Sequence, residues 1–177
     1  MPKSEQGVTA DRYAVIPRTL IFITRSGENG LEVLLIKGAP TKRLWANRYN
    51  GVGGHVERGE DVLSAARREL NEETGLRCPD LHLVGTVMVD AEAQRGISLF
   101  VFRGTYIGGS LIESHEGQLE WVPAGQLAAY PLVEDLQVLL PHLLNLPPGA
   151  PPFSALYDYD DRDQMQVHLA DASSTTS

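Results

Sequence analysis

The sequence predicts a single domain of the α+β class. Its 177 residues match the length of one domain, since domains usually run to about 100–200 residues. Apolar residues make up 42% of the chain, which is enough for a hydrophobic core. Segments rich in β-branched and aromatic residues alternate with segments whose apolar residues recur at helical spacing. This alternation indicates strands and helices packed into one unit.

Strands are expected where β-branched and aromatic residues cluster between turn residues. Turn residues at 26–30 and the DDRD segment at 160–163 indicate that the first two and the last two strands form hairpins. We expect residues 12–169 to form the domain, with flexible polar tails at 1–11 and 170–177. The predicted strands are 13–24, 31–37, 81–92, 96–108, 119–122, 153–159 and 164–169.

Two longer helices are expected between these strands. The first runs from about Asp61 to Thr74 and ends at Gly75, because glycine suits the left-handed position after a helix. The second covers 132–146, with a kink or break at Pro141. The remaining segments are a short helix that begins at Pro123, a loop at 38–49 that contains Trp45, and an acidic loop at 109–117 with Glu113, His115 and Glu116.

The charge of the chain argues against a nucleic-acid polymer as partner. The net charge is −8, and it is unevenly distributed. Residues 1–50 hold eight Lys and Arg against four Asp and Glu, whereas residues 51–177 hold seven against nineteen. An acidic chain binds DNA or RNA poorly, because that affinity depends on Lys and Arg meeting phosphates. Small anionic ligands stay possible, since a metal ion can hold them.

Other features of the composition bear on location and assembly. No stretch approaches the roughly 18 uncharged apolar residues of a transmembrane helix, so no membrane partner is expected. The polar start of the chain does not resemble a secretory signal. Cys78 is the single cysteine and cannot form an internal disulfide, which favours a reducing cytoplasm. The expected assembly is a monomer or a homodimer.

Three glutamates in the first helix form the most informative feature. Glu69, Glu72 and Glu73 stand at positions i, i+3 and i+4, which places their carboxylates on one helix face. Like charges at this spacing repel one another, and a cation would remove that cost. Hard oxygen ligands select Mg²⁺, Mn²⁺ or Ca²⁺ rather than zinc. Arg68 lies off this cluster and is expected to pair with Glu60.

The segment around these glutamates resembles the Nudix box. That motif is a glycine, five residues, a glutamate, seven residues and then Arg-Glu-apolar-any-Glu-Glu-any-Gly-apolar. The family resemblance implies an α/β/α sandwich around a mixed β-sheet. It also implies hydrolysis of a nucleoside diphosphate linked to another group, with water attacking phosphorus. The matching positions are Gly54, Glu60, Arg68, Glu69, Leu70, Glu72, Glu73, Gly75 and Leu76.

The resemblance also implies the metal site and the catalytic groups. Mg²⁺, with Mn²⁺ as a possible substitute, would be the cofactor. Glu69 and Glu116 are both candidates for the general base, and the sequence leaves this choice open. The implied metal ligands are Glu69, Glu72, Glu73, Glu116 and the carbonyl of Gly53, and the implied catalytic residues are Glu69, Glu73, Glu116 and Arg68.

The flanks of the box suggest a substrate class. The run from Tyr49 to Gly54 resembles MutT-like enzymes that hydrolyse oxidised purine nucleoside triphosphates. In those enzymes the asparagine of this run hydrogen-bonds the purine, a role that would fall to Asn50. An amide suits a base edge because it donates and accepts at once. Further substrate-binding candidates are Lys37, Gly54, Tyr130, Glu134 and Asp135, with Trp45 and His55 as possible contacts to the base and the phosphates.

The predicted activity is therefore Mg²⁺-dependent hydrolysis of a nucleoside triphosphate to nucleoside monophosphate and pyrophosphate. An oxidised purine such as 8-oxo-dGTP is the leading substrate, and sanitation of the nucleotide pool would be the benefit. Two alternatives stay open. One is hydrolysis of ADP-ribose or another nucleoside diphosphate derivative, and the other is a non-catalytic module that senses nucleotides. The intact glutamates argue against the sensing module, because a sensor could lose them freely.

Overall fold

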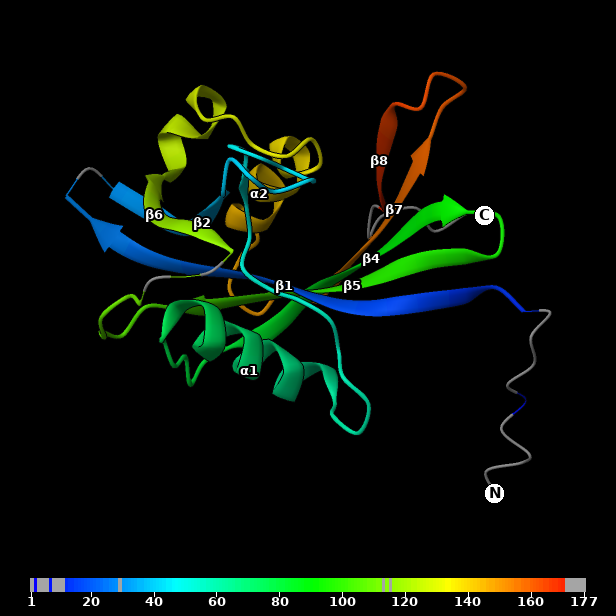
Figure 1. The fold of residues 1–177 in the computed structure, drawn as a ribbon. Coiled ribbons are helices and arrows are strands. Elements are labelled where there is room, and N and C mark those ends of the chain that lie inside the picture. The colour runs from blue at the N-terminus through cyan, green and yellow to red at the C-terminus, as the bar shows by residue number, and fades with distance from the viewer. Residues whose placement is uncertain are drawn as a thin grey trace.

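The computed structural model describes residues 2, 7, 12–28, 30–112, 114 and 116–170. Glu113 and His115 of the predicted acidic loop, and most residues of the two predicted tails, lie outside these residues. One mixed, strongly curved sheet runs through the molecule (Figure 1). Its strands are β1 (Ala14–Gly27), β2 (Gly30–Gly38), β3 (Tyr49–Asn50), β4 (His82–Glu92), β5 (Arg95–Thr105), β6 (Gly117–Pro123), β7 (Phe153–Tyr159) and β8 (Met165–Ala170).

The strand order is β3-β2-β1-β5-β4-β7-β8. Strand β6 lies outside this order and pairs with β2. The sheet is mixed because β1 runs parallel to β5 and β4 runs parallel to β7, while the remaining pairs are antiparallel. The hairpins β1–β2 and β7–β8 confirm the two that the turn residues predict. The last hairpin therefore extends the main sheet and does not stand apart from it.

Helices cover the two faces of the sheet. Helix α1 (Val62–Thr74) packs on one face through buried side chains that include Ala66 and Leu70. Helix α2 (Leu136–Leu144) packs on the other face, where Leu136, Leu139, Leu140 and Leu143 are fully buried. Figure 1 shows the two helices on opposite sides of β1 and β5. Two separate apolar clusters result, one on each face, which confirms the predicted α/β/α sandwich.

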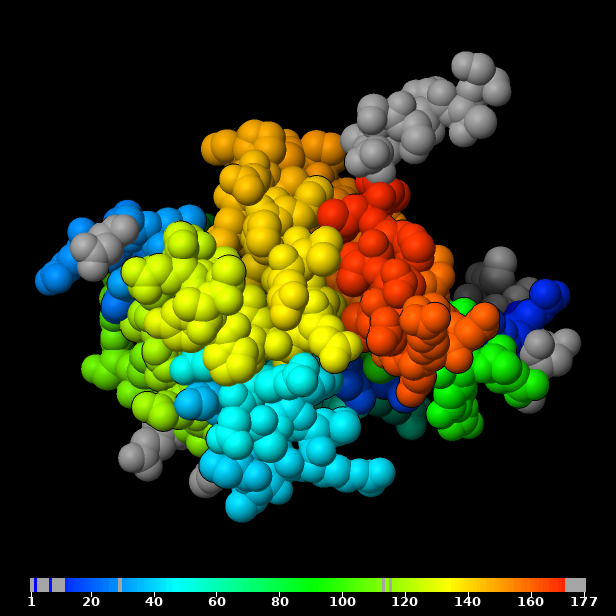
Figure 2. Space-filling view, turned by 90° about the horizontal axis from the view of Figure 1, so that it is seen from above, coloured from blue at the N-terminus to red at the C-terminus, as the bar shows by residue number. Residues whose placement is uncertain are grey.

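The hairpin β7–β8 lies beside α2 at one end of the sheet. Along β8, partly buried residues alternate with exposed ones. The partly buried residues Met165, Val167 and Leu169 pack against the apolar cluster that contains the leucines of α2. Figure 2 shows this hairpin, in red and orange, against the yellow segment that leads into α2. The hairpin therefore forms a wall next to the beginning of α2.

Helix α1 begins and ends where its sequence predicts. The carboxylate of Asp61 accepts hydrogen bonds from the backbone N–H groups of Leu63 and Ser64, at 2.9 and 3.0 Å. At the other end Gly75 adopts φ 75°, and its N–H donates to the carbonyl of Asn71. Both ends thus satisfy backbone groups that a helix terminus leaves unpaired.

Replacing Asp61 with alanine is expected to lower the free energy of unfolding by about 1 kcal/mol, because the N-cap loses its acceptor. Asp61→Asn is the matched control, since asparagine keeps an acceptor oxygen at this position. Urea unfolding of both variants measures the difference. Equal destabilisation by alanine and asparagine would contradict the capping role.

Three predictions differ from the structure. The predicted loop 38–49 ends in a short strand, because Tyr49 pairs with Lys37 of β2. The predicted helix 132–146 begins only at Leu136, since Leu132 is bridged to Tyr49 and the N–H of Val133 bonds the carbonyl of Tyr49. These backbone pairings override the helical spacing of the apolar residues. The helix also continues through Pro141 and ends at Leu144.

The short helix predicted at Pro123 is a 3₁₀ helix, η2 (Ala124–Ala129), with Pro123 at its N-cap. Within the residues that the structure describes, no helix is long and apolar enough to cross a membrane.

Candidate active site

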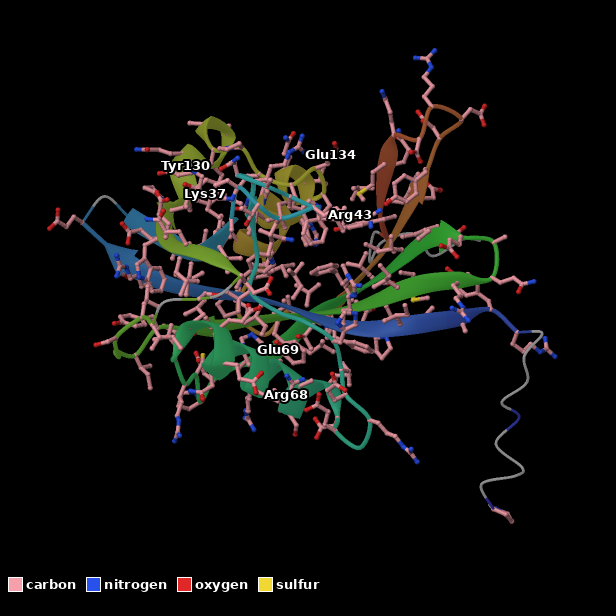
Figure 3. All side chains as sticks on the ribbon, viewed as in Figure 1. Lys37, Arg43, Arg68, Glu69, Tyr130 and Glu134 are labelled. Carbon is pink, nitrogen blue, oxygen red and sulfur yellow. The ribbon has the colours of Figure 1, made fainter. Side chains whose placement is uncertain are left out.

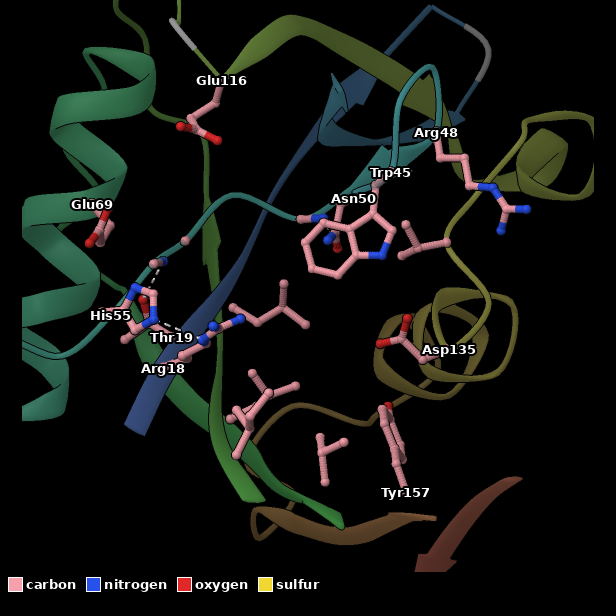
Figure 4. A pocket seen from close by; sticks show the side chains of 18 of the residues that line it. Arg18, Thr19, Trp45, Arg48, Asn50, His55, Glu69, Glu116, Asp135 and Tyr157 are labelled. Atoms are coloured by element: carbon pink, nitrogen blue, oxygen red, sulfur yellow. Dashed lines mark hydrogen bonds between the residues drawn. The ribbon is translucent and has the colours of Figure 1, made fainter. Parts of the chain in front are cut away.

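A cavity of about 830 Å³ lies where several parts of the chain meet. These include the glycine-rich loop after β3, the face of α1 that carries Glu69 and Glu73, the beginning of α2, and the β7–β8 hairpin. Figure 4 shows Glu69 and His55 at one side of the cavity, and Asp135 and Tyr157 at the other. The cavity thus joins the acidic helix to a second, distant group of polar side chains.

Backbone hydrogen bonds join the glycine-rich loop to β1. The N–H groups of Ile21 and Thr19 donate to the carbonyls of Val52 and Gly54, at 2.7 and 2.8 Å. Between them Gly53 adopts φ 150°, and a Cβ there would overlap the carbonyl oxygen of Thr19. Glycine is therefore required at 53 for the loop to approach β1. This approach also brings the loop against α1.

The loop and α1 meet at the two glutamates of the box that line the cavity. The N–H of Gly53 donates to a carboxylate oxygen of Glu73 at 3.2 Å. A Cβ on Gly54 would overlap the carboxylate of Glu69, so this glycine leaves room for that side chain. The structure therefore brings Gly53, Gly54, Glu69 and Glu73 together, as the resemblance implies.

The carboxyl of Glu73 has a strongly altered acidity. Burial, with a smaller contribution from the nearby carboxylates of Glu69 and Glu72, raises its pKa to about 7. The N–H of Gly53 and the ammonium of Lys42 act in the opposite direction but do not offset the burial. A buried carboxylate among like charges is a group that a cation would stabilise.

Arg68 forms ion pairs with Glu60, Glu69 and Glu72. Its guanidinium donates to both carboxylate oxygens of Glu60, at 2.7 and 3.2 Å, which confirms the predicted pair. The expectation that Arg68 lies off the acidic cluster is wrong, because Nη1 also donates to Glu69 at 2.9 Å and to Glu72 at 3.1 Å. Arg68 reaches them because it is adjacent to Glu69 and one helical turn from Glu72.

Arg68 also ties the loop to the helix, since Nη2 donates to the carbonyl of His55 at 3.0 Å. Glu72 is 59% exposed and does not line the cavity, unlike Glu69 and Glu73. Glu116 lines the cavity and forms an ion pair with Lys42. Among the described residues, no group of three His, Cys, Asp or Glu side chains is positioned to hold a metal ion in this arrangement.

The candidate substrate residues divide into two groups. Asn50, Trp45, Glu134 and Asp135 line the cavity, as do Gly54 and His55. Lys37 and Tyr130 do not, and Figure 3 shows both on the α2 side of the sheet, away from Arg68 and Glu69.

The two excluded side chains have other partners. The Tyr130 ring packs edge-on against Tyr49 with the ring centroids 5.2 Å apart. The Lys37 ammonium lies 5.6 Å from the centroid of the same Tyr49 ring. Both side chains therefore lie near the Tyr49 ring and do not line the cavity.

Several residues that line the cavity were not predicted from the sequence. The β7–β8 hairpin contributes Tyr157, Tyr159 and Met165, although its sequence carries no chemical motif. Arg18 of β1 also lines the cavity, and its Nε donates to Nε2 of His55 at 3.2 Å. The alternation along 153–159 does place the aromatic residues of β7 on one face, but only the parallel pairing with β4 brings that face to α2.

Asp135 is the second carboxyl of the cavity with altered acidity. Burial, with a smaller contribution from the carboxylate of Glu134, raises its pKa to about 6. Although Asp135 stands at the N-cap of α2, its side chain makes no capping hydrogen bond. Glu134 is exposed and lies 3.6 Å from Arg48 at the rim. The deeper of the two acids is therefore Asp135.

The raised pKa of Glu73 predicts how stability of the metal-free protein depends on pH. Below the ordinary value of 4.5 this carboxyl is protonated in both the folded and the unfolded chain. Between 4.5 and about 7 the unfolded chain releases the proton while the folded chain keeps it, so stability falls as pH rises through this window.

Glu73→Gln is expected to flatten that part of the profile, measured as the urea midpoint between pH 4.5 and 7.5 in the presence of EDTA. Asp135 produces a similar fall at lower pH, but it is present in both proteins and cancels in the comparison. The same slope in the variant and the wild type would contradict the assignment.

Comparison with known proteins identifies the family of this chain. Residues 16–143 match the NUDIX domain family. The oxidized purine nucleoside triphosphate hydrolase of Mus musculus is 28% identical over 132 residues, which cover 74% of this chain and 82% of the mouse protein. The protein of the same name from Danio rerio is 34% identical over 104 residues, 58% of this chain and 63% of the fish protein.

Two solved structures share the fold. The MutT protein from Bacillus halodurans superposes with a TM-score of 0.71 at 21% identity, over 87% of this chain and 97% of that protein. The NUDIX domain of Shewanella oneidensis NrtR, complexed with ADP ribose, gives a TM-score of 0.65 at 16% identity, over 80% of this chain and 96% of that domain. At such identities these likenesses concern the fold, while the family match covers most of the chain. The chain therefore belongs to the Nudix family of hydrolases.

Proposed function

We propose that this protein hydrolyses a nucleoside triphosphate to nucleoside monophosphate and pyrophosphate with Mg²⁺, and that an oxidised purine such as 8-oxo-dGTP is its leading substrate. One observation carries the proposal. A single cavity is lined by Glu69 and Glu73 of the Nudix box and by Asn50 and Asp135, and Glu69 and Asp135 lie at opposite sides of it (Figure 4). The mouse and fish relatives, which are named as oxidized purine nucleoside triphosphate hydrolases, support the same substrate class.

The chemistry of the donors at the first side suits a hard divalent cation, although among the described residues no three of them are positioned to hold an ion in the present arrangement. Glu69, Glu73 and Glu116 line the cavity with carboxylate oxygens, the ligands that Mg²⁺ prefers. The raised pKa of Glu73 indicates that the protein's own hydrogen bonds and cations do not fully stabilise the ionised form of this carboxyl. The carbonyl of Gly53 would be a further ligand, and Glu72 a more peripheral one. When bound, the cation would neutralise phosphate charge and lower the pKa of the attacking water.

The residues of the chain supply orientation and proton transfer. Glu69 or Glu116 would accept a proton from the water that attacks phosphorus, and pyrophosphate would leave as the anhydride bond breaks. In this structure Lys42 pairs with Glu116 and Arg68 pairs with Glu69. A bound cation would replace these two ion pairs. Arg68 would keep its two hydrogen bonds to Glu60, so the loop and α1 would stay connected.

The other side of the cavity would bind the base. The side-chain oxygen of Asn50 accepts from the N–H of Gly51 at 2.8 Å, which leaves its NH₂ group to donate to a ligand. Asp135 would be partly protonated near neutral pH and could donate to a base as well as accept from it. Trp45, half-exposed at the cavity, offers an aromatic face for stacking.

A substrate panel with Mg²⁺ tests the proposal. Nucleoside triphosphates, including 8-oxo-dGTP and unmodified dGTP, and ADP-ribose are incubated with the protein, and monophosphate and pyrophosphate are measured. We expect pyrophosphate release, with the highest kcat/KM for an oxidised purine. A preference for ADP-ribose would replace the proposed substrate class. Binding of nucleotides without turnover of any of them would favour the sensing module.

A further inference from the structure

The hydroxyl of Tyr157 is an unpaired polar group at the floor of the cavity. Tyr157 is 1% exposed, and its hydroxyl has no hydrogen-bond partner among the described residues. A buried polar group that lacks a partner destabilises the folded protein. The inward neighbours on β7 are Phe153 and Ala155, so packing alone would be satisfied by phenylalanine at this position.

The acid whose charge acts on this hydroxyl is Asp135, at the beginning of α2. Figure 4 shows the hydroxyl end of Tyr157 directed toward the Asp135 carboxyl across the lower part of the cavity. Burial raises the pKa of Tyr157, and the charge of Asp135 raises it further, which places the two groups within electrostatic reach. No hydrogen bond joins them in this structure, and the carboxyl of Asp135 does not cap its helix.

Two polar groups thus face one another without a bond, at the end of the cavity where the base would bind. A carboxyl has two oxygens, and a tyrosine hydroxyl can donate to one of them while the other stays free. Such a bond would fix the side-chain rotamer of Asp135. It would do so whether the carboxyl is ionised or protonated, because each form keeps one acceptor oxygen for the hydroxyl.

We propose that Tyr157 is a positioning residue for base recognition, whose hydroxyl donates to one oxygen of Asp135 when a nucleotide binds and directs the other oxygen at the hydrogen-bonding edge of the base. This inference rests on the proposed function, since it assumes that the cavity binds a nucleotide. It assigns a role in specificity to the β7–β8 hairpin. The ligand class is a nucleotide whose base presents a polar edge rather than an apolar surface.

The test is a double-mutant cycle of Tyr157→Phe and Asp135→Ala. Tyr157→Phe removes one oxygen and keeps the packed ring, so thermal unfolding should show an unchanged or slightly higher melting temperature. We expect KM for the preferred triphosphate to rise about three- to tenfold with kcat nearly unchanged, the size of one lost hydrogen bond. The dissociation constant of the matching monophosphate in EDTA should rise by a similar factor, and this readout needs no turnover.

The cycle shows whether the Tyr157 hydroxyl affects nucleotide binding through Asp135 or independently of it. In the Asp135→Ala background, Tyr157→Phe should have almost no further effect on KM or on monophosphate binding, because the group it positions is gone. Tyr106→Phe is the matched control, since it removes a hydroxyl that bonds the carbonyl of Gly109 outside the cavity. KM should not change in that control.

Each contrary outcome is informative. An unchanged KM in Tyr157→Phe, or the same loss with and without Asp135, would overturn the inference while leaving the proposed function intact. A wild-type protein that neither binds nor hydrolyses any nucleotide would overturn both.

Discussion

Glu73→Gln is expected to lower kcat/KM for the preferred triphosphate by at least about 10²-fold. A catalytic metal ion typically contributes several kcal/mol to stabilising phosphoryl transfer, and 1.36 kcal/mol corresponds to a factor of ten. Glutamine has nearly the same shape but carries no charge, so it weakens a ligand without removing the packing. The fold should persist, because the charged form of Glu73 is already disfavoured by burial.

The control for this loss is Glu92→Gln, which removes one negative charge from the exposed end of β4, outside the cavity. Its kcat/KM should stay within about twofold of wild type, as expected for a change at an exposed surface position. Steady-state kinetics with saturating Mg²⁺ measures both variants. Full activity of Glu73→Gln would contradict its assignment as a metal ligand.

Glu72→Gln gives a graded comparison in the same experiment. The resemblance includes Glu72 among the ligands, yet the structure places its carboxylate outside the cavity and against Arg68. A smaller loss than that of Glu73→Gln is therefore the expected order. The size of the difference measures how far the metal site extends along the helix.

Removal of divalent cations is expected to abolish turnover, with a decrease of at least about 10³-fold in kcat/KM. Without a cation, the carboxylates of Glu69, Glu73 and Glu116 would repel a triphosphate at the same side of the cavity. Affinity for the triphosphate should fall strongly in EDTA. The monophosphate should lose less affinity, because much of its binding would come from the base side.

Calorimetric titration of triphosphate and monophosphate, each with Mg²⁺ and with EDTA, measures this difference. Adding excess Mg²⁺ to the EDTA-treated protein is the control, since it should restore both activity and affinity. Equal triphosphate affinity with and without the cation would contradict the proposed role of the glutamates. The net charge of −8 would then remain without a functional explanation.

The sequence alone predicts the local parts of the site well. Helix α1 lies at the predicted residues, because its ends depend on Asp61 and Gly75, which act on their own neighbours. Gly53 and Gly54 lie against Glu73 and Glu69, since only a short loop separates the glycines from helix α1. The hairpins β1–β2 and β7–β8 also follow from turn residues close to their strands.

Long-range contacts explain where those predictions fail. Lys37 and Tyr130 carry suitable chemistry for a substrate, but both are held by Tyr49, which is distant from Tyr130 in sequence. The beginning of α2 is delayed to Leu136 by the backbone bonds between Val133 and Tyr49. Periodicity and residue type contain no information on these partners.

The sequence by itself thus determined the family resemblance, the capped acidic helix and the glycine-rich loop, because each depends on residues close together in the chain. The tertiary structure decided which side chains share the cavity. It placed Glu73 inside and Glu72 outside, and it brought Tyr157 from the last hairpin toward Asp135. The physical reason is that burial and strand pairing between distant segments set the surroundings of each group, and those surroundings determine its charge state and its partners.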